Sequence, residues 1–143
     1  MAQGFGAKFI PAETTTVEQM AQQVGNVDVV YEATGVSSLS YEVMKYLGVN
    51  GAFIFTGVPA LKGPKSIDVD LIMRNQVLKN QVMLGTVNAS KQSFGDAISD
   101  LNRFNQRWPK SVGSLITHRF PIDRAKEPLS GHVGGIKSVI KIA

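Results

Sequence analysis

The sequence predicts an α/β fold built on a largely parallel sheet. Short segments rich in β-branched and aromatic residues recur at 27–32, 51–57 and 81–88. Segments with apolar residues at helical spacing alternate with them. Each apolar segment finishes in small or hydroxyl-bearing residues. In a parallel sheet the carboxyl ends of the strands face one crevice, in which a ligand can bind.

The segment VDVVYEATG, residues 27–35, is the clearest of these strands. It is too short for a helix, and its valines suit a strand that is covered on both faces. It ends at Ala33, Thr34 and Gly35, a small turn where a ligand can approach the backbone closely. Taken alone, these nine residues fit an ordinary strand-to-helix turn better than a ligand site, because short motifs recur by chance.

The residues before this strand are expected to contain the end of a helix, a short strand and a complete helix. Gly6 is placed to stop a helix that precedes it. Lys8 to Ile10 is a very short strand candidate, which the following proline ends. A helix is predicted from Thr14 to Val24, because its apolar residues recur at spacings of three, one and three.

After the strand at 27–32, Ser37 or Ser38 can cap a helix that Gly48 and Gly51 end. The strand at 51–57 follows, and it ends in a hydroxyl and a glycine, as the first strand does. A loop at 59–64 and a short helix from Asp68 to Lys79 lead to the strand at 81–88.

The remaining chain is expected to form a helix capped by Ser90, with an apolar side that faces the core and comprises Phe94, Ala97, Ile98, Leu101 and Phe104. Pro109, after Trp108, breaks this helix. Later strands are predicted at 113–120 and 138–142, with a weak helix at 122–129 between them.

Composition restricts the class of protein. At 143 residues the chain is sized for one domain, and its 43% hydrophobic and 18% charged residues are typical of a soluble globular protein. No apolar run is long enough for a membrane span, and the N-terminus lacks the pattern of a secretory signal, so a cytoplasmic location is expected. The net charge of +4 comes from scattered residues, which favours a role in solubility or an anionic small ligand over a nucleic-acid surface.

A metal site built from this chain is not expected. There are no cysteines, and the two histidines, His118 and His132, are too few for a histidine-rich centre. His118 lies in a strand-like segment and is predicted to be structural. Glu32 has no histidine or lysine neighbour in the sequence, so it receives no catalytic role. The single tryptophan offers no aromatic platform for single-stranded nucleic acid.

The order of the pieces FGAKFI, VDVVYEATG, GAFIFTGVP, GTVNA and LITHRFPID resembles the cofactor-binding half of the medium-chain zinc-dependent dehydrogenases. GTVNA and the C-terminal GGIKSVIKI are most similar to the glucose 1-dehydrogenase branch, and the similarity covers nearly all 143 residues. The resemblance implies an oxidoreductase of carbohydrate metabolism that passes hydride from the anomeric carbon of a sugar to NADP or NAD, while zinc polarises the substrate oxygen.

Two parts of the family pattern are missing. The glycine-rich turn G-x-G-x-x-G, which follows the first strand of the nucleotide domain, does not occur in this sequence. The catalytic domain with the zinc ligands and most sugar contacts is missing as well. The resemblance therefore implies that residues 1–143 are the C-terminal portion of a dinucleotide-binding domain, a partial doubly wound, Rossmann-like parallel sheet lacking its first two strands. Such a chain is expected to bind no zinc and to be inactive by itself.

The resemblance assigns cofactor-binding roles only where its motifs are present. Thr34 and Gly35 would approach the ribose and pyrophosphate, and Lys137 would lie near a cofactor phosphate. The end of the second strand would line the cofactor with Thr56, Gly57 and Val58. The end of the third would meet the nicotinamide with Thr86, Val87 and Asn88. Asn88 would also lie near a sugar hydroxyl, and no catalytic residue is assigned.

Alternative explanations exist for each residue and for the whole chain. The threonines can simply satisfy loop backbone, Asn88 can be a turn residue, and Lys137 can be a solvated surface charge. The chain can be a non-catalytic binding or dimerisation module, or another doubly wound nucleotide-dependent enzyme. The strand order 3-2-1-4-5-6 of a complete domain would leave 27–32 as an exposed edge here, so a homo-oligomer is expected.

Overall fold

The computed structural model describes residues 1–131 and 133–142. The length of the chain predicts one domain, whereas the structure divides it into two compact units. The sheet unit comprises Ile10–Asn88. The C-terminal unit comprises the chain from Ala89 onward together with Met1–Phe9, and each unit is described by itself.

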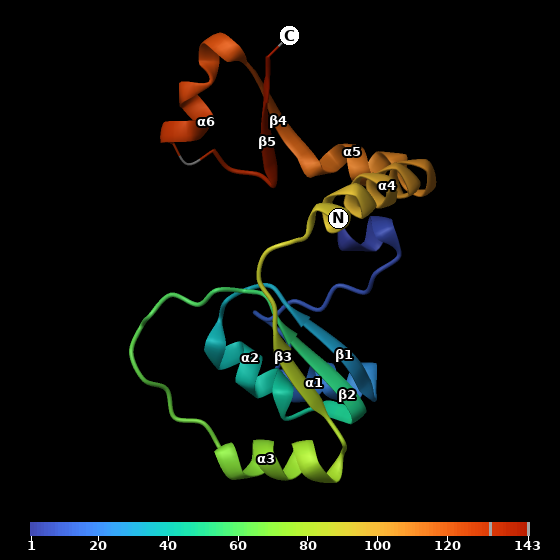
Figure 1. Ribbon diagram of the computed structural model, residues 1–143, viewed down its shortest axis with the longest axis vertical. Helices are drawn as coiled ribbons and strands as arrows, with labels where there is room; N and C mark the ends of the chain where they lie inside the picture. The colour runs from blue at the N-terminus through green and yellow to red at the C-terminus, as the bar shows by residue number, and fades with distance from the viewer. Residues whose placement is uncertain (132, 143) are drawn as a thin grey trace. The chain divides into compact units, whose positions relative to one another are not determined.

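The sheet unit contains three parallel strands in the order β1-β2-β3 (Figure 1). These are β1 (Val27–Glu32), β2 (Leu47–Phe55) and β3 (Val82–Gly85). The predicted parallel α/β fold is confirmed, and β1 has the predicted bounds. β2 begins earlier than predicted, at Leu47, because the preceding helix already ends at Met44 and Leu47 is fully buried.

Three helices accompany the sheet, α1 (Val17–Val24), α2 (Ser37–Met44) and α3 (Val69–Leu78). Thr16 caps α1 in a reciprocal capping box with Gln19, and Asp68 caps α3 by accepting a hydrogen bond from the Leu71 amide at 2.9 Å. The predicted strand at Lys8–Ile10 is wrong: these residues form no strand in the structure, because no strand pairs with them.

The core of the sheet unit lies where α2, β2 and α3 meet. Met44, Leu47, Phe53 and Ile72 are its buried residues. Phe53 packs on Phe55 with a ring-centroid distance of 4.7 Å, so the interaction between the two rings stabilises the core in addition to the burial of apolar surface. This cluster fixes β2 as the central strand against which β1 and β3 are paired.

The register of the sheet aligns the carboxyl ends of its strands. Glu32 pairs with Phe55, and Phe55 pairs with Gly85. Hydrogen bonds continue this alignment past the last paired residues, from Thr56 N to Glu32 O at 2.9 Å and from Thr86 N to Phe55 O at 3.0 Å. The residues that follow the three strands therefore lie along one edge of the sheet.

The C-terminal unit begins with the 3₁₀ helix η1 (Ala2–Phe5), which Gly6 stops with a φ of 81° as predicted. The part after Ala89 contains α4 (Lys91–Arg107), α5 (Pro109–Leu115), η2 (Ile122–Arg124) and α6 (Lys126–Ser130). Its strands β4 (Ile116–Pro121) and β5 (Lys137–Lys141) form a parallel pair. The strand predicted from 113 starts only at Ile116, because α5 continues to Leu115.

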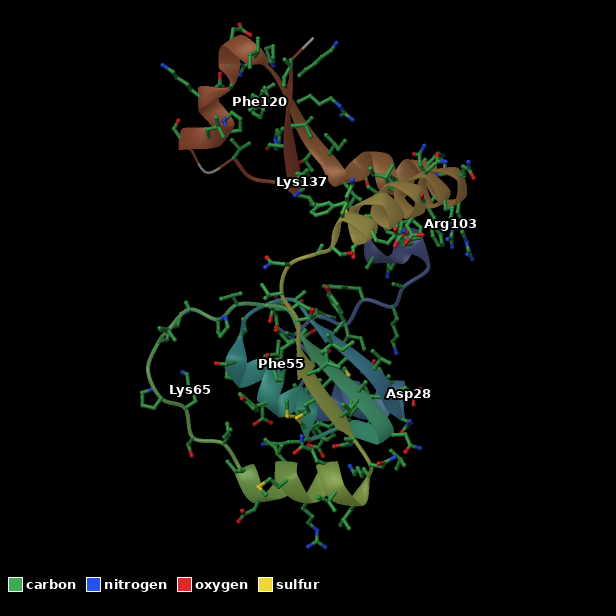
Figure 2. The ribbon with its side chains drawn as sticks, viewed as in Figure 1. Asp28, Phe55, Lys65, Arg103, Phe120 and Lys137 are labelled. Atoms are coloured by element: carbon green, nitrogen blue, oxygen red, sulfur yellow. The ribbon has the colours of Figure 1, made fainter. Side chains whose placement is uncertain are left out.

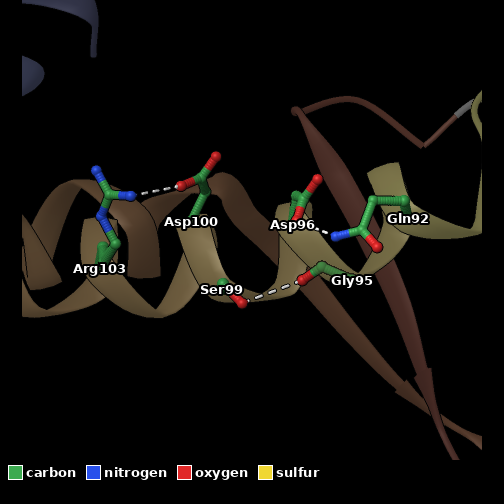
Figure 3. Close-up of polar contacts among 6 residues, drawn as sticks. All are labelled: Gln92, Gly95, Asp96, Ser99, Asp100 and Arg103. Carbon is green, nitrogen blue, oxygen red and sulfur yellow. Dashed lines mark hydrogen bonds and ion pairs between the residues drawn. The ribbon is translucent and has the colours of Figure 1, made fainter.

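Helix α4 is amphipathic, and the structure corrects one expectation about it. Ser90 caps it, as predicted. Its polar side carries local contacts such as the Arg103–Asp100 ion pair at 3.1 Å and a Gln92–Asp96 hydrogen bond at 2.8 Å (Figure 3). The apolar side, predicted to face the core, is instead exposed along Phe94, Ala97, Ile98, Leu101 and Phe104. Within its own unit the principal neighbour of α4 is α5, which does not cover that side.

The junction of α4 and α5 is held by Trp108. Phe5 of η1 packs edge-on against Trp108 at a ring-centroid distance of 5.9 Å, and the Arg107 guanidinium lies 4.4 Å from the same ring. These contacts explain why the first residues of the chain belong to the unit formed by its last third.

No described helix combines the length and the apolar character that crossing a bilayer requires.

Candidate functional site

The turn after β1 brings the backbone of two loops together. Gly35 has a φ of 67°, and a Cβ at this position would lie 2.7 Å from the carbonyl oxygen of Val58. Only glycine combines this left-handed conformation with so close an approach. The predicted pair Thr34 and Gly35 is therefore shaped by contact with the loop after β2.

The turn after β2 is tied to the first one. The Thr56 hydroxyl donates a hydrogen bond to the carbonyl oxygen of Glu32 at 2.7 Å. A Cβ at Gly57 would meet the amide nitrogen of Gly35 and would lie 2.7 Å from Glu32 Oε2. Two glycines thus face each other where β1 and β2 end, and the carboxylate of Glu32 lies against both turns.

The turn after β3 completes the edge. Thr86 continues the sheet by its bond to Phe55, while the side chain of Val87 is exposed. Asn88 adopts a φ of 67°, a conformation that asparagine tolerates better than most residues. The turn-residue explanation of Asn88 accounts for this backbone, and its exposed amide remains accessible to a ligand.

Two hollows along this edge gather most of the predicted residues. One, of about 320 Å³, lies between the ends of β2 and β3 and is lined by Phe55, Thr56, Gly57, Val58, Pro59, Gly85, Thr86 and Val87. The other, of about 420 Å³, lies beside the turn after β1 and includes Thr34, Gly35, Val58, Lys62 and Lys65. Figure 2 shows Phe55 on β2 and Lys65 on the long loop before α3.

Sequence reasoning missed the two lysines of the second hollow. Lys62 and Lys65 stand in a loop rich in glycine and proline, and nothing in their spacing distinguishes them from solvated charges. The structure places them beside Thr34 and Gly35. They give this end of the edge a positive charge that suits a phosphate-bearing ligand.

Glu32 is the buried charged residue at this edge, and sequence reasoning assigned it no catalytic role. The hydroxyl of Thr34 is the main cause that lowers the pKa of its carboxyl below the ordinary value of 4.5, and the amides of Thr34, Gly35 and Gly57 act in the same direction against the effect of burial. Its contribution to stability is therefore present above that ordinary value and is lost as the pH falls through the folded-state pKa.

Lys137 and His118 lie in the C-terminal unit. Lys137 is exposed at the start of β5, and its role at a cofactor phosphate stays a prediction. The ring of His118 is stacked on Phe120 at a centroid distance of 6.1 Å, and its buried Nδ1 has no hydrogen-bond partner among the described residues. This packing agrees with the structural role predicted for His118, while His132 lies outside the described residues.

A metal ion finds no set of ligands in the part of the chain that the structure describes. No three histidine, cysteine, aspartate or glutamate side chains of residues 1–131 and 133–142 come together closely enough to hold one. These residues therefore do not fit a zinc site. The glycines and hydroxyls at the strand ends, in contrast, fit a ligand that approaches the backbone.

Comparison with known proteins decides the family. The family model described as glucose dehydrogenase C-terminus matches residues 1–142. The chain belongs to this family. Glucose 1-dehydrogenase of Methanocella arvoryzae is 26% identical over 142 residues, which are 99% of this chain and 40% of that protein. Glucose 1-dehydrogenase of Thermoproteus tenax is 30% identical over 146 residues, 99% of this chain and 39% of that protein.

Solved structures agree with the fold. Glucose dehydrogenase from Haloferax mediterranei, in complex with NADP, Zn and gluconolactone, superposes with a TM-score of 0.82 at 24% identity, over 99% of this chain and 39% of that one. An alcohol dehydrogenase from Thermotoga maritima gives a TM-score of 0.70 at 27% identity, over 90% of this chain and 35% of that one. The chain spans about 40% of the length of the curated relatives it matches. The resemblance and the partial Rossmann-like fold expected from the sequence are thus confirmed.

Proposed function

We propose that this chain is the NAD(P)-binding portion of a glucose 1-dehydrogenase. The observation that carries the proposal is the alignment of three strand ends, which places the predicted turns 34–35, 56–58 and 86–88 at one edge of the sheet. The family supports the choice of ligand, since the related enzyme from Haloferax mediterranei is described with NADP.

Each turn has a distinct task in this proposal. The nicotinamide cofactor, when bound, accepts hydride from the anomeric carbon of the sugar. Gly35 and Gly57 let it approach the backbone, while the Thr34 side of the edge, with Lys62 and Lys65 nearby, receives the ribose and its phosphates. Thr86, Val87 and Asn88 orient the nicotinamide, and the Asn88 amide also contacts a sugar hydroxyl.

The described residues do not fit zinc, so no step through zinc is derived from them. We propose that the zinc ligands and most sugar contacts come from another part of a longer protein. This chain alone then binds cofactor without oxidising sugar, because the alkoxide that precedes hydride transfer lacks a stabilising group.

Calorimetric titration of the purified chain with NADP is expected to show weak binding, with a dissociation constant above about 1 μM, a value that corresponds to about 8 kcal/mol. Affinity is low because the glycine turn that binds the pyrophosphate in the family pattern is not in the sequence. Asn88→Gly is expected to weaken binding about threefold to tenfold through the loss of one hydrogen bond. Glycine keeps the positive φ of Asn88, so the backbone is preserved.

Asn80→Gly is the matched control, because Asn80 also has a positive φ, of 51°, but lies before β3 at the opposite end of that strand. Its replacement is expected to leave NADP affinity unchanged. Absence of NADP binding would refute the proposed function. Equal losses in the two variants would remove Asn88 from the site.

A second proposal concerns assembly, and the exposed edge of β1 favours it. β1 pairs only with β2 in the part of the chain that the structure describes, and its side chains Val29 and Tyr31 are 62% and 67% exposed. An unpaired edge of this kind lowers its free energy by pairing with another strand. We therefore propose that the isolated chain forms a homo-oligomer through this edge.

Light scattering over a range of concentrations is expected to show the wild-type chain as a dimer or larger oligomer. Val29→Lys is expected to shift it toward monomer, because a lysine on an edge strand discourages pairing. Val77→Lys, at an exposed position of α3, is the control and should leave the oligomer intact. A wild-type chain that stays monomeric at high concentration would contradict this assembly.

A further inference from the structure

Glu32 holds both of the turns that the proposed function places against the cofactor. Its side chain is 7% exposed, and Oε1 accepts hydrogen bonds from Thr34 N at 2.7 Å, from Thr34 Oγ1 at 2.6 Å and from Gly35 N at 2.9 Å. Its backbone carbonyl accepts bonds from Thr56 N at 2.9 Å, Thr56 Oγ1 at 2.7 Å and Gly57 N at 3.1 Å. One residue therefore accepts six hydrogen bonds from two loops.

These bonds extend into the helix that follows. Thr34 Oγ1, which donates to Glu32, accepts a hydrogen bond from Val36 N at 3.1 Å. Val36 is the N-cap residue of α2, and no side chain caps that helix. The carboxylate of Glu32 thus fixes the conformation of the whole connection between β1 and α2, through charge-assisted bonds that are stronger than neutral ones.

We propose that Glu32 is a positioning residue for cofactor binding: its carboxylate sets the turn at Thr34 and Gly35, and its carbonyl sets the turn at Thr56 and Gly57, in register with each other. This inference rests on the proposed function and adds to it a residue outside the set predicted to contact the cofactor. Affinity for the cofactor then depends on a side chain that bonds to the protein's own turn.

The geometry argues against a direct role for Glu32 as a base. Oε1 already accepts from three donors, and Oε2 lies so close to Gly57 that a Cβ there would be 2.7 Å away. The three donors on Oε1 stabilise the charged carboxylate, which makes it a weak base in this position. Among titratable groups, Tyr41 of α2 lines the same hollow as Glu32, and Lys62 and Lys65 line the hollow beside the turn.

The test compares Glu32→Gln with Glu13→Gln, a control that removes an exposed carboxylate from a turn of the same unit. In the chain of residues 1–143, the amide protons of Thr34 and Gly35 are followed by NMR, NADP affinity by calorimetry and the melting temperature by circular dichroism. Glu32→Gln is expected to move both amide resonances upfield, because a neutral acceptor replaces a charged one, and to weaken NADP binding about tenfold. The Thr86 amide, which donates to Phe55, should stay in place.

The outcomes separate this inference from the proposed function. If the wild type binds NADP and folded Glu32→Gln binds it equally well, with a lower melting temperature alone, Glu32 is merely structural and the inference is overturned. If the wild type does not bind NADP, the proposed function fails, and the positioning role toward the cofactor fails with it. Amide shifts seen in Glu32→Gln but not in Glu13→Gln would then show only that Glu32 holds the turns.

A second variant keeps the test decisive if Glu32→Gln does not fold. Thr34→Val removes one donor to Oε1 and keeps the charge, and Thr34→Ser restores the hydroxyl. The inference requires weaker NADP binding and a shifted Gly35 amide in Thr34→Val, and recovery of both in Thr34→Ser. An unmoved Gly35 amide in Thr34→Val would overturn it even if NADP binding weakens, because Thr34 itself is placed near the ribose.

Discussion

Phe53→Ala is expected to lower the free energy of unfolding of the sheet unit by about 3–5 kcal/mol, the usual cost of removing a buried phenylalanine ring. Phe53 is 0% exposed and lies in the cluster with Met44, Leu47 and Ile72, so its loss leaves a cavity between the central strand and two helices. A loss of this size approaches the whole stability of a small domain. Urea denaturation followed by far-ultraviolet circular dichroism measures it.

Phe94→Ala is the control for this prediction, because Phe94 is 66% exposed on α4. Its replacement is expected to change stability by less than about 0.5 kcal/mol. A cost below about 1 kcal/mol for Phe53→Ala would show that β2 is not the centre of a packed core.

Gly35→Ala is expected to have the second large effect, on stability and on NADP binding together. The added methyl group would lie 2.7 Å from the Val58 carbonyl oxygen in a backbone with a φ of 67°. Positive φ costs a residue other than glycine about 1–3 kcal/mol, and relieving the clash requires the two turns to move apart. Calorimetry should then detect no NADP binding, while thermal denaturation reports the loss of stability.

Gly25→Ala separates the strain of a positive φ from the clash with the Val58 carbonyl. Gly25 has a φ of 79°, but nothing lies within 4 Å of a Cβ built there. This variant therefore suffers only the strain of positive φ and should bind NADP as the wild type does. Loss of NADP binding in Gly25→Ala as well would mean that the contact between Gly35 and Val58 is not what the site depends on.

Local patterns predicted where the strands of the sheet unit end, and parallel pairing brings these ends to one edge. The segment 27–32 has the composition of a strand, and the structure has a strand with these bounds. The burial expected on both faces is wrong, because Val29 and Tyr31 are exposed. Three strand ends with small or hydroxyl-bearing residues lie at one edge because Glu32, Phe55 and Gly85 pair in register. The turn chemistry at Ser90 and Gly6 likewise depends on neighbouring residues and is confirmed.

Features that depend on distant parts of the chain could not be predicted in this way. The apolar spacing along α4 predicts a helix but does not say what covers it, and Phe94 is exposed in the structure. The role of Glu32 depends on hydrogen bonds to residues in two turns, one of which follows a different strand. No spacing rule in the sequence signals that arrangement.

The distribution of aromatic residues gives the two units separate optical signals. Trp108 belongs to the C-terminal unit, whereas Tyr31, Tyr41 and Tyr46, the three tyrosines of the chain, belong to the sheet unit. Light at a wavelength that only tryptophan absorbs therefore excites Trp108, which lies outside the sheet unit. Tryptophan emission follows the packing of Phe5 and Arg107 around one ring, and tyrosine emission follows the unit that carries the candidate site.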